Sequence, residues 1–198
     1  MKKSLLCWTN WAVKNGKQVG LFSDSICNRM SKFDLNELIT NHTVIKKAFP
    51  GATSNDLSSH YMIPTLENNT PDTAIIHVGI NDLLAQSVDG GLSSNSIDEI
   101  ANNIIKCGQV CKSFGVNDIC ISSVLPKRGY KAQLSVKHIN DRLLSLCERN
   151  SFDFLLNDNI IFDATKEANT LFYNDGLHLN SAGRKVLIEN FKCYLDRI

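Results

Sequence analysis

The sequence predicts an α/β fold, namely a three-layer α/β/α sandwich around a central five-stranded parallel sheet. Short apolar runs alternate with longer stretches in which apolar residues recur every three or four positions. The first pattern is typical of buried parallel strands, and the second of the helices that connect them. The chain has 198 residues and a hydrophobic content of 43%, which is enough for one packed core. We therefore expect one domain over residues 17–198, preceded by an N-terminal extension at residues 1–16.

The expected strands are short apolar runs bounded by turn residues, at residues 18–23, 43–49, 73–78, 118–124 and 152–156. The expected helices lie at residues 28–40, 55–66, 96–114, 132–150 and 181–195. This alternation leads us to expect the flavodoxin-like strand order 2-1-3-4-5. The last helix has Asn180 or Ser181 as its N-cap and an apolar stripe of Leu187, Phe191 and Leu195. Residues 86–95 are rich in Gly, Ser, Asp and Asn, which predicts a surface loop.

Composition argues against several classes of function. The formal net charge of +1 provides no general attraction for a phosphate backbone, so we expect no direct nucleic-acid binding by this domain. The 7 cysteines are an odd number spread through apolar stretches, which favours buried thiols in a reducing, cytoplasmic compartment. The apolar run near the N-terminus is too short for a signal peptide, and no stretch is long enough to span a membrane. Any membrane contact is expected to be peripheral.

Polar residues and a glycine follow the first three predicted strands, at the edge where open parallel sheets bind their ligands. Ser25 comes after the first strand, at a turn where a helix N-terminus favours developing negative charge. Gly51 follows the second strand and can bring its backbone N–H close to an oxyanion. Asn81 follows the third strand and can donate from its side-chain amide. Taken singly, each of these residues is explained as well by turn or cap chemistry.

Near the C-terminus, Asp175 precedes His178 by three positions, in a short loop before the last helix. A carboxylate so placed can orient an imidazole and stabilise its protonated form, as the base of a serine nucleophile requires. The alternative is that Asp175 begins a turn with Gly176 and that His178 is a structural residue. A serine, a glycine N–H, an asparagine amide and an Asp–His pair at one sheet edge are jointly hard to explain by turns. They favour a catalytic site.

These segments resemble the four sequence blocks of the SGNH (GDSL-like) hydrolases, in the same order along the chain. The matching segments are residues 23–25, Gly51, residues 79–82 and residues 175–178. The resemblance implies Ser25 as nucleophile, His178 as general base and Asp175 as its orienting partner. It also implies an oxyanion hole formed by the N–H groups of Ser25 and Gly51 and the side chain of Asn81. One departure is that Ser23 stands where the family carries glycine, and we expect activity to survive it.

Residues 49–57, 122–130 and 175–183 are also similar to the esterase domain in first-open-reading-frame proteins of LINE-type retrotransposons. Those domains in turn resemble platelet-activating-factor acetylhydrolases. The likeness implies acetyl or other short-chain esters as substrates, lipid esters included, and a larger parent protein. Two alternatives stay open. One is a non-catalytic module of the same fold that binds RNA or protein, and the other is a carbohydrate acetylesterase.

Three other signals carry less weight. Cys107 and Cys111 share a helical face, but no second ligand pair accompanies them, so we expect neither a metal nor a cofactor. His77 lies in an apolar strand and is expected to be a hydrogen-bonded core residue. Residues 127–130, with Lys127, Arg128 and Tyr130, form either a solvated basic loop or a flank of the pocket that meets an anionic headgroup.

Overall fold

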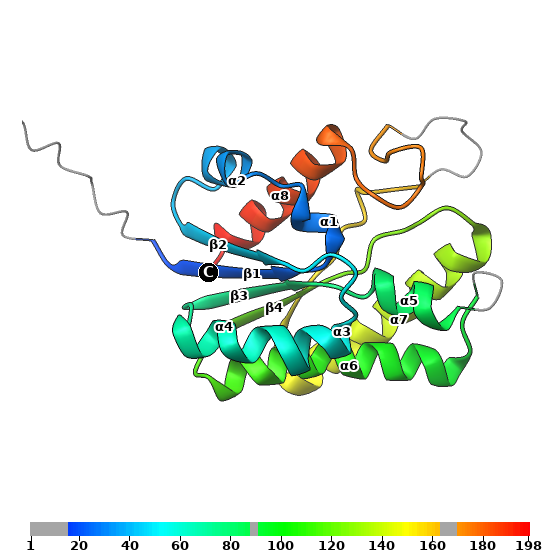
Figure 1. The fold of residues 1–198 in the computed structure, drawn as a ribbon, viewed down its shortest axis with the longest axis horizontal. Helices are drawn as coiled ribbons and strands as arrows, with labels where there is room; N and C mark the ends of the chain where they lie inside the picture. The colour runs from blue at the N-terminus through cyan, green and yellow to red at the C-terminus, as the bar shows by residue number, and fades with distance from the viewer. Residues whose placement is uncertain (1–15, 88–90, 163–169) are drawn as a thin grey trace, which may run out of the picture.

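The computed structural model describes residues 16–87, 91–162 and 170–198, and it confirms the predicted α/β/α sandwich (Figure 1). One sheet contains five parallel strands in the expected order, β2-β1-β3-β4-β5. The strands are β1 (Gln18–Ser23), β2 (Thr43–Ala48), β3 (Thr73–His77), β4 (Asp118–Ser122) and β5 (Asp153–Leu155). β1 matches its prediction, and the other strands are one or two residues shorter than predicted. Apart from Gly16, the predicted N-terminal extension lies outside the described residues.

Helices cover both faces of the sheet (Figure 1). One layer holds α1 (Ser25–Asn28), α2 (Lys32–Leu38) and α8 (Ser181–Leu195), and α2 contacts α8 within it. The other layer holds α3 (Ser54–Asp56), the π-helical turn η1 (Leu57–Tyr61), α4 (Met62–Asn68), α5 (Ile80–Gln86), α6 (Ser94–Ser113) and α7 (Tyr130–Asn150). The long helices α6 and α7 pack against each other below β3, β4 and β5.

Local capping explains where the helices depart from their predicted bounds. The helix predicted at residues 28–40 corresponds to α2, which begins later because Ser31 caps it: the Ser31 hydroxyl accepts the Asp34 N–H, and the Asp34 side chain accepts the Ser31 N–H. The sequence did not predict α1 as a separate helix, and α1 shares only Asn28 with the predicted one. The helix predicted at residues 55–66 is divided by η1. The sequence did not predict α5, which precedes the expected loop at residues 86–95, shares only Gln86 with it, and buries Ile80 and Leu83.

The core lies on both faces of the sheet. All five residues of β3 are buried, as are five of the six residues of β1, so both strands are covered from two sides. The predicted stripe of α8 is confirmed, since Leu187, Phe191 and Leu195 are all buried. Asn180 is the N-cap of this helix and accepts the Gly183 N–H at 3.0 Å.

Five cysteines are buried free thiols, at Cys27, Cys107, Cys111, Cys120 and Cys147. Cys193 is exposed, and Cys7 lies outside the described residues. Within the described ranges, no helix combines the length and the apolar character needed to cross a bilayer.

Candidate active site

Ser25 is the first residue of α1, directly after β1. The preceding residue, Asp24, is the N-cap of this short helix, and its carboxylate accepts the Ile26 N–H at 2.9 Å. Ser23 is fully buried and keeps its regular pairing in the sheet, opposite Ala48 on one side and His77 on the other. Serine in place of the family's glycine therefore leaves the end of the strand regular, and Ser25 lies at the carboxyl edge of the sheet.

Asp175 and His178 lie in the turn before α8, and this turn is held by its own backbone. The Tyr173 N–H donates to the His178 carbonyl at 2.8 Å, and Phe172 forms an isolated antiparallel bridge with Leu179. One Asp175 oxygen accepts the His178 N–H at 2.9 Å, while the other lies 2.8 Å from His178 Nδ1. The imidazole and the carboxylate are thereby oriented toward each other.

The electrostatics of Asp175 favour its charged form. Partial burial by itself raises the pKa of this carboxyl. The backbone N–H groups of His178 and Leu177, together with the His178 ring, outweigh this effect and bring the pKa below its usual value. Asp175 is therefore an anion at neutral pH, available to stabilise a positive charge on the imidazole.

At this point the structure brings the start of α1 next to the turn before α8. His178 Nε2 lies 3.2 Å from Ser25 Oγ, although the two residues are 153 positions apart in sequence. With Nδ1 directed at Asp175, the neutral ring can carry its proton on Nδ1 and accept the serine proton on Nε2. The His178 side chain is 30% exposed, so an external substrate can reach the line of three groups.

A hydrogen bond joins the loop that carries Gly51 to the start of α5, where Asn81 lies. Gly51 has a φ of +82°, a backbone conformation that favours glycine, and it is exposed after β2. Asn81 lies in the first turn of α5, and its side-chain amide donates to the Ala52 carbonyl at 2.9 Å. An amide nitrogen carries two hydrogens, so this bond leaves one donor for an incoming ligand.

Two buried carboxylates near these loops were not among the predicted site residues. Asp82 accepts the Ser54 N–H at 2.9 Å and also the Ser54 hydroxyl, which joins the start of α3 to α5. Burial raises the pKa of Asp82. Burial, with a contribution from Asp82, raises the pKa of Asp24 to about 7. Asp24 and Asp82 lie within the sequence blocks at residues 23–25 and 79–82, but the sequence analysis gave them no role. The signal that could have identified them is that each directly adjoins a predicted site residue.

The described residues contain no group of three or more His, Cys, Asp or Glu side chains that could hold a metal ion. Cys111 is buried, and burial raises the pKa of its thiol to about 12, so this thiol is protonated at neutral pH. His77 is buried and its Nδ1 lies 2.9 Å from Ser122 Oγ, which confirms the prediction of a hydrogen-bonded core residue.

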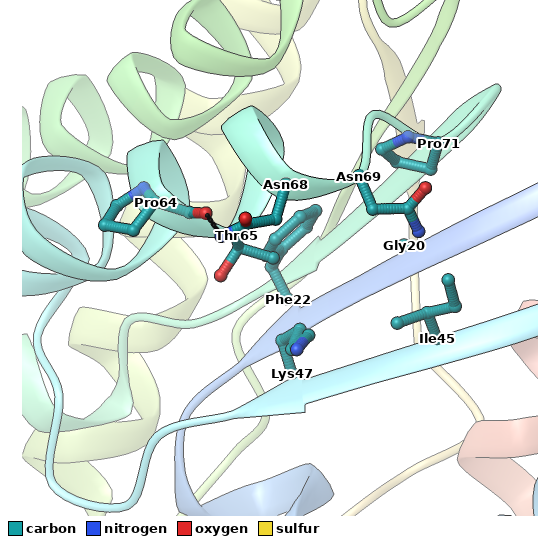
Figure 2. Close-up of a pocket in the computed structure, with 9 residues that line it drawn as sticks. All are labelled: Gly20, Phe22, Ile45, Lys47, Pro64, Thr65, Asn68, Asn69 and Pro71. Carbon is teal, nitrogen blue, oxygen red and sulfur yellow. Dashed lines mark hydrogen bonds between the residues drawn. The ribbon is translucent and has the colours of Figure 1, made fainter.

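Two cavities lie near the sheet. Figure 2 shows one of about 260 Å³ between α4 and strands β1 and β2, lined by Phe22, Ile45 and Pro64 among others. A larger one, of about 530 Å³, opens beyond the carboxyl ends of β4 and β5 and includes Val124 and Phe162 in its lining. None of the predicted site residues lines either cavity.

A parallel α/β sandwich that aligns a serine hydroxyl, an imidazole and a carboxylate at its carboxyl edge has the arrangement of a serine hydrolase. The chain belongs to the GDSL-like Lipase/Acylhydrolase family, whose family model matches residues 20–186. Among curated proteins, a sequence search finds no match.

Solved structures of similar fold include three named hydrolases. A GDSL-like lipase from Bacteroides thetaiotaomicron has a TM-score of 0.73 at 20% identity, covering 93% of this chain and 90% of its own. A carbohydrate acetylesterase from Sinorhizobium meliloti has a TM-score of 0.69 at 14% identity, covering 91% and 99%. A catalytic mutant of an acetylxylan esterase from Geobacillus stearothermophilus has a TM-score of 0.70 at 17% identity, covering 91% and 94%. At these identities the likeness shows a common fold.

Proposed function

We propose that this protein is a serine esterase that hydrolyses acetyl and other short-chain esters through a triad of Ser25, His178 and Asp175. The observation that carries the proposal is the hydrogen-bonded line of the three side chains, with 3.2 Å between Ser25 Oγ and His178 Nε2 and 2.8 Å between His178 Nδ1 and Asp175. These distances suit transfer of the serine proton to the imidazole. Membership of an acylhydrolase family supports the same reaction.

The proposed reaction is a double displacement. His178 removes the hydroxyl proton of Ser25 as the serine oxygen attacks the ester carbonyl, and Asp175 stabilises the resulting imidazolium. His178 then returns the proton to the leaving alcohol, which leaves an acyl-enzyme on Ser25. A water molecule, deprotonated by His178, then attacks the acyl group. The bond to Ser25 breaks as His178 returns this proton to the serine oxygen, which releases the acid and restores the free enzyme.

The oxyanion formed in each step carries a full negative charge that needs donors. We assign this role to the backbone N–H groups of Ser25 and Gly51 and to the side-chain amide of Asn81. The bond from Asn81 to the Ala52 carbonyl supports the assignment, because it holds the Asn81 amide beside the loop that carries Gly51.

The decisive experiment compares wild type with Ser25→Ala, using p-nitrophenyl acetate and then longer acyl chains. We expect hydrolysis by wild type that falls as the acyl chain lengthens, and a loss on the order of 10⁴-fold or more in Ser25→Ala. Ser59→Ala removes an exposed hydroxyl of η1 and serves as the matched control, with wild-type activity expected. Equal rates for wild type and Ser25→Ala would refute the proposal.

The same proteins distinguish an esterase from a non-catalytic module that binds RNA or protein. A fluorophosphonate probe reacts with an activated serine, so it should label wild type and Ser59→Ala but not Ser25→Ala. A module without an activated serine would stay unlabelled in all three forms.

A carbohydrate acetylesterase is the second candidate, and the specific observation in its favour is the fold shared with a carbohydrate acetylesterase and an acetylxylan esterase. The likeness to retrotransposon esterase domains and platelet-activating-factor acetylhydrolases instead favours lipid acetyl esters. A cytoplasmic location stays a prediction, and so does peripheral membrane contact. Comparing the rates of hydrolysis of acetylated xylo-oligosaccharides and acetylated phospholipids would distinguish a carbohydrate acetylesterase from a lipid acetylesterase.

A further inference from the structure

Arg128 lies in the loop between β4 and α7 and contacts the loop that carries Asp175 and His178. Its backbone N–H donates to the Gly176 carbonyl at 2.8 Å. Its guanidinium donates through Nη2 to the Asn174 carbonyl, also at 2.8 Å. The two accepting carbonyls belong to the residues on either side of Asp175, so Arg128 fixes the backbone both before and after this carboxylate.

The two loops are in close contact at Gly176. This residue is buried and has a φ of +66°, and a Cβ placed on it would lie 2.7 Å from Arg128 Cβ and 2.8 Å from Arg128 Nε. Any side chain at position 176 would therefore displace Arg128. Glycine at this position allows the arginine to lie directly on the turn.

The guanidinium is also supported from a second direction. Arg128 Cζ lies 6.0 Å from the centre of the Phe162 ring, a distance at which a cation and an aromatic face attract each other. Phe162 in turn packs edge-on against Phe172 at 5.3 Å, and Phe172 bridges to Leu179 next to His178. Arg128 is thus part of the packing that supports both ends of the turn.

We propose that Arg128 is a positioning residue that holds Asp175 and His178 in the geometry needed for general-base catalysis. This inference rests on the proposed esterase function. Arg128 acts by donating hydrogen bonds to backbone carbonyls. In this proposal the substrate is contacted by the triad and the oxyanion donors. Its loss therefore weakens the alignment of His178 with Ser25 while leaving substrate binding intact.

Arg128→Ala tests the side chain alone, because the backbone N–H that donates to Gly176 is kept. Since small misplacements of catalytic groups are costly, we expect kcat for p-nitrophenyl acetate to fall about 10- to 100-fold, with KM within about twofold of wild type. Arg128→Lys keeps one charged donor but loses the planar guanidinium, so it should recover part of the rate. Millimolar guanidinium ion added to Arg128→Ala should restore part of kcat, because the site is exposed and the ion supplies the missing donor.

Lys131→Ala is the matched control, since it removes a nearby exposed positive charge at the start of α7 and should keep wild-type kcat. Wild-type kcat in Arg128→Ala would overturn the inference. So would a loss of kcat that neither guanidinium nor Arg128→Lys reverses, because that result indicates a general structural role. If Arg128→Ala fails to fold, the kcat of Arg128→Lys decides, and a value equal to wild type counts against the inference. Failure of the esterase proposal is recognised separately, by wild type and Ser25→Ala having equal rates.

Discussion

At the scale of single residues, the polar side chains of the candidate site are oriented by hydrogen bonds within the protein. Both oxygens of Asp175 accept hydrogen bonds, and both ring nitrogens of His178 face a partner. Asn81 uses one amide hydrogen on the Ala52 carbonyl. Because each side chain is already oriented, the proposed reaction needs little reorganisation of these groups when charge develops in its transition state.

Asn81→Ala tests the assignment of Asn81 as an oxyanion donor. Removing one such donor costs on the order of 3 kcal/mol of transition-state stabilisation, so we expect kcat to fall about 100-fold or more. The KM should change little, because the lost bond forms mainly in the transition state. Steady-state hydrolysis of p-nitrophenyl acetate measures both constants. Asn95→Ala, at an exposed position of α6, is the control, and a kcat for Asn81→Ala equal to that of Asn95→Ala would exclude the role.

Single residues also show which parts of the site a sequence can predict. Ser25, Gly51, Asn81, Asp175 and His178 carry recognisable chemistry directly after predicted strands or before the last helix. The partners of Asp82 and Arg128 could not be predicted in this way. Asp82 binds Ser54, 28 positions away, and Arg128 binds Asn174, 46 positions away, so both contacts depend on how the loops meet in space.

At the scale of secondary structure, buried strands were easier to predict than helix boundaries. Continuous apolar runs identify strands that are covered on both faces, and all five predicted strands are present. Helix boundaries depend on single capping side chains. Ser31 starts α2 at Lys32 rather than at residue 28, and α5 was missed because Asn81 and Asp82 in its first turn are residues typical of turns.

The cap of α8 is a testable contribution to stability. The Asn180 side chain accepts the Gly183 N–H at 3.0 Å and donates to the Thr170 carbonyl at 2.9 Å. Loss of an N-cap typically costs about 1 kcal/mol, so Asn180→Ala should lower the free energy of unfolding by about 1–2 kcal/mol. Asn180→Ser keeps a capping oxygen and should lose less. Urea denaturation measures the difference, and equal losses in the two variants would contradict a role for the cap.

At the scale of the whole molecule, the order of the strands follows from their connections. The first connection places β2 on one side of β1, and the next one returns across β1 so that β3, β4 and β5 follow on its other side. β1 pairs with β3, so Ser25 and Asn81, at the starts of the helices that follow these strands, lie beyond neighbouring strands. Periodicity predicts the strands and the helices, whereas the convergence of the loops follows from the topology.

The buried carboxyl of Asp24 should make the stability of the whole domain depend on pH. Burial raises its pKa from 3.8 to about 7, so between these values the folded protein keeps a proton that the unfolded chain has lost. The contribution of Asp24 to the free energy of unfolding is therefore fully present below about pH 4. It decreases as pH rises toward 7, by at most about 4 kcal/mol. Asp24→Asn keeps an acceptor for the Ile26 N–H but cannot titrate, so it should lose less stability between pH 5 and pH 8.

Urea denaturation at the two pH values measures this difference. Asp158→Asn, at an exposed carboxylate, is the control and should keep the wild-type pH dependence. The assignment is wrong if Asp24→Asn loses as much stability between pH 5 and pH 8 as the control does.

Ser25 and His178 are separated by most of the described chain, yet their side chains meet at 3.2 Å. Closing so long a loop is entropically unfavourable until many other contacts have formed. A partly folded chain with a complete strand β1 but an undocked α8 would have the proposed nucleophile without its proposed base. If the proposed esterase function is correct, turnover requires both α1 and the turn before α8 to be in their native positions, and a form in which either is misplaced would be inactive.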